Sequence, residues 1–168
     1  MPLEEAFISD SPYGPGGLLI DEVVSMDAER SHIAVRMPTT EDLPLTREQR
    51  VHPVRHPRHV SGGLMVHMTG MVALAHSYYL LGLRHADGWI GYGGRIHSAR
   101  FKALAKPGEP LILECTAKQL RQSDTQVLAR YDFRFTQKDV LVYEGDQTAL
   151  WMKVDESKGA VDATANAG

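Results

Sequence analysis

Histidines carry the most distinctive chemistry of this sequence, because several of them are closely spaced. The chain has eight histidines, and four follow one another within a short stretch: His52, His56, His59 and His67. An unperturbed imidazole titrates near ~6.5, so one ring can accept a proton while its neighbour donates one. The type of these residues therefore makes them candidates for proton transfer.

The segment after the loop, which must position part of this chemistry, is apolar on nearly every side. A surface helix would place polar and apolar residues on opposite faces, and residues 64–81 do not. Ser61 is suited to cap the start of a helix with its hydroxyl. We therefore predict a long helix after Ser61, buried by the rest of the chain.

A membrane-spanning helix is the alternative for this segment, since its length is near the ~20 residues that cross a bilayer. His67 and His76 lie inside it, however, and the remainder of the chain has the pattern of ordinary strands. The first ten residues, MPLEEAFISD, are acidic and lack the features of a signal peptide. We expect a core helix and no membrane partner.

The remaining sequence predicts an antiparallel sheet of six strands. Residues 1–17 contain several Pro and Gly and are expected to be irregular. Alternating apolar residues predict the strands, of which the last four would form a meander; the predicted strands are 18–26, 31–37, 89–104, 111–122, 125–136 and 140–154. We expect one domain over residues 1–155 and a disordered polar tail over 156–168.

Composition narrows the class of function. The net charge of −3 argues against a general nucleic-acid-binding protein, which would be basic. The single cysteine, Cys115, excludes an internal disulfide and fits a reducing, cytoplasmic compartment. Because Cys115 lies in an alternating apolar run, a buried structural thiol is favoured over a nucleophile.

Three stretches of the sequence carry a family resemblance. They are Leu18–Val24, the segment from His52 through Gly62 into the apolar helix, and Ala99–Lys102 with Lys106–Glu109. In this order they resemble the opening strand, the active-site loop and the third strand of the β-hydroxyacyl-ACP dehydratases. The resemblance implies an α+β hotdog fold, in which an antiparallel sheet wraps around one long buried central helix.

The resemblance also implies a function. Members of this family are dimers or larger oligomers that process acyl groups carried on coenzyme A or acyl carrier protein, and they need no other cofactor. In the family a loop histidine removes the α-proton and a helix carboxylate of the other protomer protonates the departing hydroxyl. Backbone N–H groups at the helix start polarise the thioester carbonyl, which matches Gly62 and Gly63 here and suits the dipole of a helix N-terminus.

The sequence departs from the family at the catalytic positions. Neither His52-Pro53-Val54-Arg55 nor His56-Pro57-Arg58-His59 matches the family motif His-Phe-Pro-Gly, and Val60-Ser61-Gly62 replaces Met-Pro-Gly. His67 occupies the position of the helix carboxylate, and no Asp or Glu occurs between Glu48 and Asp87. A dehydratase would therefore use two imidazoles, with His52 as the base and His67 as the acid.

Other interpretations of these residues stay open. His56 or His59 could contact the substrate in place of His52, and His67 could be a hydrogen-bonded core or interface group. We interpret His76 as structural. The loop histidines could hold a metal, but the interleaved arginines would repel a cation and no carboxylate or cysteine is near, so no metal is expected.

Basic and methionine side chains are candidates for substrate binding. The basic residues could bind the phosphates of coenzyme A or an acidic carrier protein; the candidates are Arg55, Arg58, Arg100 and Lys102. Met65 and Met68 could line an acyl tunnel, because methionine adapts to flexible chains.

Three functions remain in order of preference. The first is a dehydratase-like enzyme, a lyase of fatty-acid or polyketide synthesis, with altered catalytic residues. The second is a thioesterase that uses a loop histidine to activate water, and the third is a subunit that binds acyl thioesters without catalysis.

Overall fold

A computed structural model describes residues 1–155 of the chain, and the predicted tail over 156–168 lies outside the described residues. Within these residues two short helices come first, and six strands, a long helix and a short 3-10 helix follow. The elements are α1 (Glu5–Asp10), α2 (Pro15–Leu18), β1 (Glu22–Asp27), β2 (His32–Met37), α3 (Gly62–Leu81), η1 (His85–Asp87), β3 (Trp89–Phe101), β4 (Leu111–Gln122), β5 (Gln126–Gln137) and β6 (Val140–Lys153).

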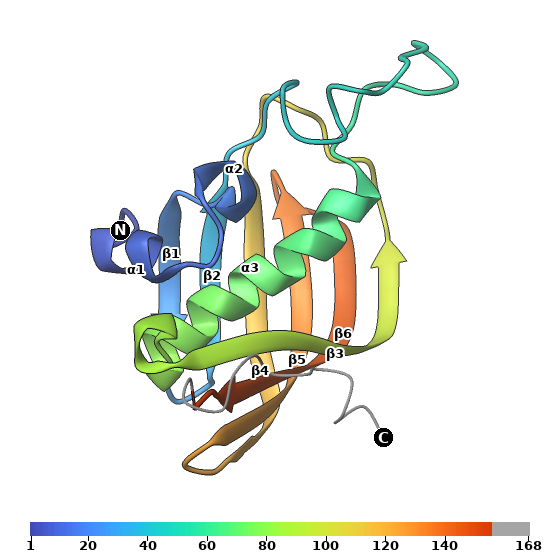
Figure 1. Cartoon of the computed structure of the whole chain (residues 1–168). Coiled ribbons are helices and arrows are strands. Elements are labelled where there is room, and N and C mark those ends of the chain that lie inside the picture. The colour runs from blue at the N-terminus through green and yellow to red at the C-terminus, as the bar shows by residue number, and fades with distance from the viewer. Residues whose placement is uncertain (156–168) are drawn as a thin grey trace.

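The six strands form one antiparallel sheet in the order β1-β2-β4-β5-β6-β3. Figure 1 shows this sheet curling around α3, with β3 running from the C-terminal end of the helix across the lower part of the view. The prediction of a four-strand meander is correct for β4, β5 and β6 and wrong for β3, which pairs with β6 at the far edge. A helix that is apolar on all sides must be covered by strands on both of its sides, and β3 covers the side opposite β1 and β2.

Helix α3 begins and ends where the sequence places its signals. The Ser61 hydroxyl accepts a hydrogen bond from the Gly63 N–H at 3.3 Å, and Gly82 ends the helix in the left-handed conformation with φ 67°. The helix is long and apolar enough to cross a membrane, but 61% of its most apolar 18-residue stretch is buried inside the protein. Its packing against the sheet agrees with the predicted core helix.

The N-terminal residues are more ordered than expected. Instead of an irregular segment they form α1 and α2. Leu19, in the left-handed conformation with φ 55°, ends α2. The first strand then starts at Glu22 and not at residue 18 as predicted. Phe7 of α1 is fully buried and packs its ring 5.0 Å from that of Tyr78. The Asp10 carboxylate then accepts hydrogen bonds from the first backbone N–H groups of η1, at 2.8 and 2.7 Å. These contacts attach the N-terminal segment to the C-terminal end of α3.

His76 is part of the core. Its Nε2 lies 3.0 Å from the Ser31 carbonyl oxygen, which can only accept, so Nε2 carries the hydrogen and Nδ1 accepts from the Tyr131 hydroxyl at 3.1 Å. Burial lowers the pKa of His76 to about 4, so the ring is neutral at pH 7. Cys115 is also fully buried, and burial raises the pKa of its thiol. Both residues have the structural positions that the sequence predicts.

Candidate functional site

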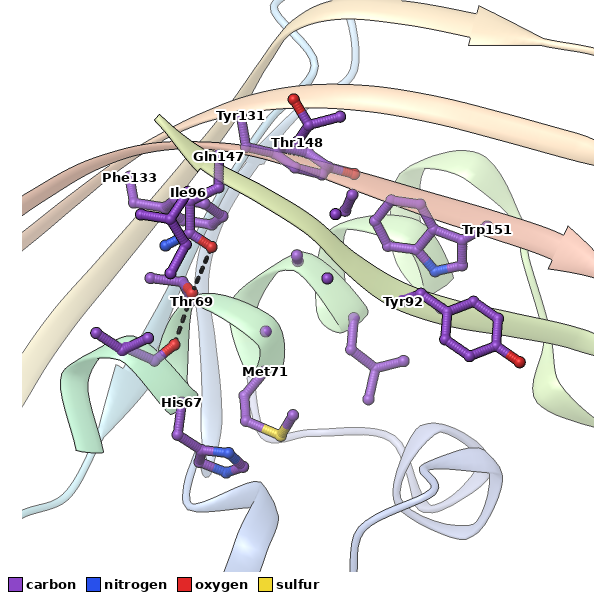
Figure 2. A pocket seen from close by; sticks show the side chains of 18 of the residues that line it. His67, Thr69, Met71, Tyr92, Ile96, Tyr131, Phe133, Gln147, Thr148 and Trp151 are labelled. Carbon is purple, nitrogen blue, oxygen red and sulfur yellow. Dashed lines mark hydrogen bonds between the residues drawn. The ribbon is translucent and has the colours of Figure 1, made fainter. Parts of the chain in front are cut away.

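A cavity of about 390 Å³ lies between α3 and the edge of the sheet formed by β3 and β6. Val66 to Leu74 of α3 form one wall, and the glycine-rich stretch 91–96 of β3 forms the opposite wall. The aromatic side chains around it make most of its surface apolar; Figure 2 shows several of them, Tyr92, Tyr131, Phe133 and Trp151. A partly open, mostly apolar hollow with a few polar groups is a usual form of a small-molecule site.

The polar groups of the cavity cluster near one turn of α3. The Thr69 hydroxyl lies 2.7 Å from the Val66 carbonyl oxygen and 3.0 Å from the Gln147 side-chain oxygen, so it links α3 to β6 (Figure 2). The Gln147 amide nitrogen in turn lies 3.3 Å from the Tyr143 hydroxyl. Within the described chain, no Asp or Glu lines this cavity. Among the described side chains that line the cavity, the imidazole of His67 is the group whose type suits proton transfer near neutral pH.

His67 lines the cavity, and its ring is held on one side. Its Nε2 lies 2.7 Å from the Gly17 carbonyl oxygen, which can only accept, so Nε2 carries the hydrogen. The other nitrogen, Nδ1, has no hydrogen-bond partner among residues 1–155 and carries the lone pair when the ring is neutral. Figure 2 shows the His67 ring turned toward the N-terminal segment, where it meets the Tyr13 ring edge-on at 5.3 Å. In this tautomer His67 can accept a proton, whereas the sequence prediction assigned it the acid.

The three loop histidines do not line the cavity. The chain between β2 and α3 extends away from the sheet beyond the start of α3 (Figure 1). Within it His52 and His56 pair their backbones, with N···O distances of 2.8 and 3.0 Å. The Nδ1 of His52 accepts hydrogen bonds from the Val54 and Arg55 N–H groups, at 3.2 and 3.0 Å. Within one chain the loop thus folds back on itself, away from His67 and its cavity.

His59 lies closer to the body of the protein. Gln49 brackets its backbone, accepting from the His59 N–H at 3.1 Å and donating to its carbonyl at 2.9 Å. Its Nδ1 donates to the Pro57 carbonyl at 2.8 Å, which leaves Nε2 free to accept. The rings of His56 and His59 are 5.1 Å apart. These two imidazoles therefore lie beside each other in the loop.

The start of α3 lies one turn away from the cavity wall. The Gly63 N–H is bonded to Ser61, and the Gly62 N–H has no partner in the described part of the chain. The Phe101 ring covers Gly62 so closely that an added Cβ would lie 2.9 Å from it. Gly62 therefore permits this close approach and keeps a free donor at the positive end of the helix.

The predicted basic residues have different surroundings. Arg100 and Lys102 both bind Glu144, at 3.2 and 3.1 Å, and these two cations lower the pKa of the Glu144 carboxyl. Arg58 binds the Thr46 carbonyl at 2.9 Å and approaches Glu41 at 3.6 Å. Arg55 is exposed and has no ion pair within residues 1–155. Of the four candidates, Arg55 is therefore the one that is available to an anion without first losing an ion pair.

Several residues of the cavity were not predicted as site residues. Met65 and Met68, predicted to line the tunnel, are instead buried in the core, and Met71, one turn later, faces the cavity. The alternation in 125–136 places Tyr131 and Phe133 on the buried face of β5, which is the available signal for them. Tyr13 and Trp151 come from distant parts of the chain, and nothing in the local pattern joins them to His67.

No protein-family model and no curated protein matches the sequence. Similar solved structures include a mutant thioesterase of Pseudomonas aeruginosa, with 15% identity and a TM-score of 0.59 over 92% of this chain and 96% of that one. The dehydratase heterocomplex ApeI:P of Xenorhabdus doucetiae has 12% identity and a TM-score of 0.60 over 94% of this chain and 93% of the other. The PaaI protein from the phenylacetic acid degradation operon of E. coli has 15% identity and a TM-score of 0.55, covering 80% of this chain and 85% of that chain.

These similarities agree with the architecture described above. The long helix enclosed by a six-stranded antiparallel sheet is the hotdog fold, as the sequence predicts. At such low sequence identity the similarity concerns the fold, and one fold can carry different activities.

Proposed function

We propose that this chain processes acyl thioesters, with the acyl group in the cavity between α3 and β3 and the carrier, coenzyme A or acyl carrier protein, outside it. The observation that carries the proposal is an apolar cavity that is lined by an imidazole with a free nitrogen, His67 Nδ1. The hotdog neighbours, which include thioesterases and a dehydratase heterocomplex, support an acyl-thioester substrate.

The reaction that we favour is dehydration of a 3-hydroxyacyl thioester. Neutral His67 takes the α-proton through Nδ1, and a protonated imidazole from a second chain donates to the departing hydroxyl. This division of roles reverses the one predicted from the sequence, since the bond from Nε2–H to Gly17 leaves Nδ1 of the neutral ring as the nitrogen that can accept a proton. The loop histidines His56 and His59 are the candidates for the second imidazole, since their loop extends from the body (Figure 1).

A second chain would be added at the edge of the sheet. Strand β3 has β6 on one side and no strand on the other within the described chain, and its side chains Ile96 and Phe101 are 51% and 54% exposed. An unpaired edge of this length is a template for another strand. We propose that two chains pair there as a homodimer, which sedimentation velocity tests directly; a monomer at the concentration of the assay would contradict it.

The test of dehydration is direct interconversion of a 3-hydroxyacyl-CoA and the matching enoyl-CoA, followed by enoyl absorbance. His67→Gln should reduce the rate by about 100-fold or more, because the proton acceptor is removed. His32→Gln is the matched control, since His32 bonds Thr116 between β2 and β4 and does not line the cavity. No interconversion between pH 5 and pH 9 would refute the dehydratase proposal.

Thioester hydrolysis is the second candidate. The cavity of one described chain contains a single imidazole and no carboxylate. A thiolate leaves more readily than hydroxide, so one base that activates water is sufficient for hydrolysis. Release of free coenzyme A, detected with a thiol reagent and lost in His67→Gln, would support this candidate. If neither reaction occurs but acyl-CoA raises the melting temperature, the chain is a binding subunit.

A further inference from the structure

A second cavity, of about 350 Å³, continues along α3 from the first. It reaches Ser77 near the end of the helix, and Leu83 and Trp89 are among the residues that line it. The two cavities together follow α3 from Val66 to Ser77, a distance of roughly 16 Å at the rise of a helix. They are therefore two compartments of one groove.

Five residues line both cavities and so mark where the two compartments meet; we call them the division between the compartments. They are Pro12, Tyr13, Leu74, Gly91 and Trp151. Leu74, Gly91 and Trp151 belong to α3, β3 and β6, and their positions are fixed by the helix and the sheet. A side chain added at Gly91 would lie 2.8 Å from the Trp151 indole nitrogen, so no further side chain fits there. Pro12 and Tyr13 instead belong to the connection between α1 and α2.

Tyr13 is held more weakly than the other members of this division. Its side chain is 44% exposed, and its hydroxyl has no hydrogen bond within residues 1–155. The ring rests against Gly17, where an added Cβ would lie 3.0 Å from it, and meets His67 edge-on. The ring therefore lies where the two compartments meet, beside the imidazole to which we assign the proton transfer. No hydrogen bond of its hydroxyl within residues 1–155 holds the side chain in this position.

We propose that Tyr13 sets the length of the acyl group that this chain accepts. The inference rests on the proposed function and deepens it. With Tyr13 in place, an acyl chain that enters beside His67 ends in the first compartment, so acyl groups of medium length bind best. Removal of the ring joins the compartments, and a longer chain then buries its additional methylenes along Ser77 and Leu83 instead of leaving them in water.

The experiment compares the binding of octanoyl-CoA and palmitoyl-CoA to wild type, Tyr13→Ala and Tyr13→Phe by calorimetry. Tyr13→Ala should raise the affinity for palmitoyl-CoA relative to octanoyl-CoA by about tenfold or more, since each buried methylene is favourable. Tyr13→Phe keeps the ring and should retain the wild-type ratio. Tyr92→Ala is the matched control, because Tyr92 lines only the first cavity; it enlarges that compartment without joining the two.

The inference would be overturned if Tyr13→Ala left the ratio of the affinities for palmitoyl-CoA and octanoyl-CoA unchanged, or if Tyr92→Ala changed that ratio equally. Octanoate and palmitate, competing with a fluorescent fatty-acid analogue, separate this outcome from failure of the proposed function. If no thioester binds but the free acids show the change in ratio, the length-setting role stands and the thioester proposal fails. If neither the thioesters nor the free acids bind to wild type or Tyr13→Ala, the length-setting role of Tyr13 and the thioester proposal are both refuted.

Discussion

The two ends of α3 differ in how their polar groups are satisfied. At the start of the helix the Gly62 N–H has no partner in the described chain, His67 keeps a free nitrogen, and the preceding loop extends outward. Toward the other end both nitrogens of His76 are bonded, and Asp10 caps the short helix that follows. Unpartnered polar groups are available to a ligand, whereas partnered ones stabilise the fold. One end of this helix is thus suited to binding and the other to stability.

Removing the buried imidazole should have the largest effect on stability. His76→Leu deprives the buried Tyr131 hydroxyl of its partner and should lower the free energy of unfolding by about 3 kcal/mol. Urea denaturation measures this change. His67→Leu, the same substitution at the other end, should cost less than half as much, because His67 is only partly buried. Equal losses of unfolding free energy in His76→Leu and His67→Leu would contradict the proposed difference between the two ends of α3.

Acid should destabilise the protein through the same residue. The pKa of His76 is about 4 in the folded protein and 6.5 when unperturbed, so between these values the unfolded chain binds more protons. Stability is complete above pH 6.5 and falls by about 3 kcal/mol as the pH approaches 4. Urea melts at several pH values test this. Asp146, whose pKa is lowered to about 2, affects stability only below this pH range. The free energy of unfolding of His76→Leu should therefore be almost independent of pH between 4 and 6.5.

The attachment of the N-terminal segment should contribute a smaller amount. Asp10→Ala removes the acceptor of two backbone N–H groups and should lower the free energy of unfolding by about 1–2 kcal/mol. Thermal unfolding provides the measurement. Asp10→Asn, which retains one carbonyl acceptor, should recover part of the loss. A full loss in Asp10→Asn would show that the charge, rather than the hydrogen bonds, stabilises this contact.

The cap at the start of α3 should contribute least to stability. Ser61→Ala removes a hydrogen bond of 3.3 Å to an N–H that remains accessible to water, so the expected loss of stability is about 0.5–1 kcal/mol. Thermal unfolding again measures it, with Ser61→Asp as a variant that should restore the cap. If Ser61→Ala is as damaging as His76→Leu, the start of α3 is as important to the fold as its other end.

The sequence predicts what depends on local pattern. Ser61 and the apolar run after it locate α3, and the alternation around Tyr131 places the buried face of β5. The pairing of β3 with β6 could not be predicted in this way, because it depends on the path of residues 102–110 from one edge of the sheet to the interior. Short α1 and α2 were missed because they have too few residues to show a helical period.

The candidate site was predicted less well, for a related reason. The family resemblance identified His52 and His67 as chemical groups, but it could not show that the His52 ring accepts hydrogen bonds from its own turn. Tyr13 lies in a segment marked mainly by Pro and Gly, and its neighbour His67 is far away in sequence. Contacts between distant segments define this cavity, and periodicity within a segment contains no information about them.

The position of β3 beside the last strand also affects how the chain emerges from the ribosome. Helix α3 is synthesised before β4, β5 and β6, and its apolar surface lacks most of its cover until Val140–Lys153 has appeared. At about 5–20 residues per second this exposure lasts several seconds. Nascent chains of this protein should therefore be bound by chaperones that recognise apolar helices, and a truncation before residue 140 should aggregate.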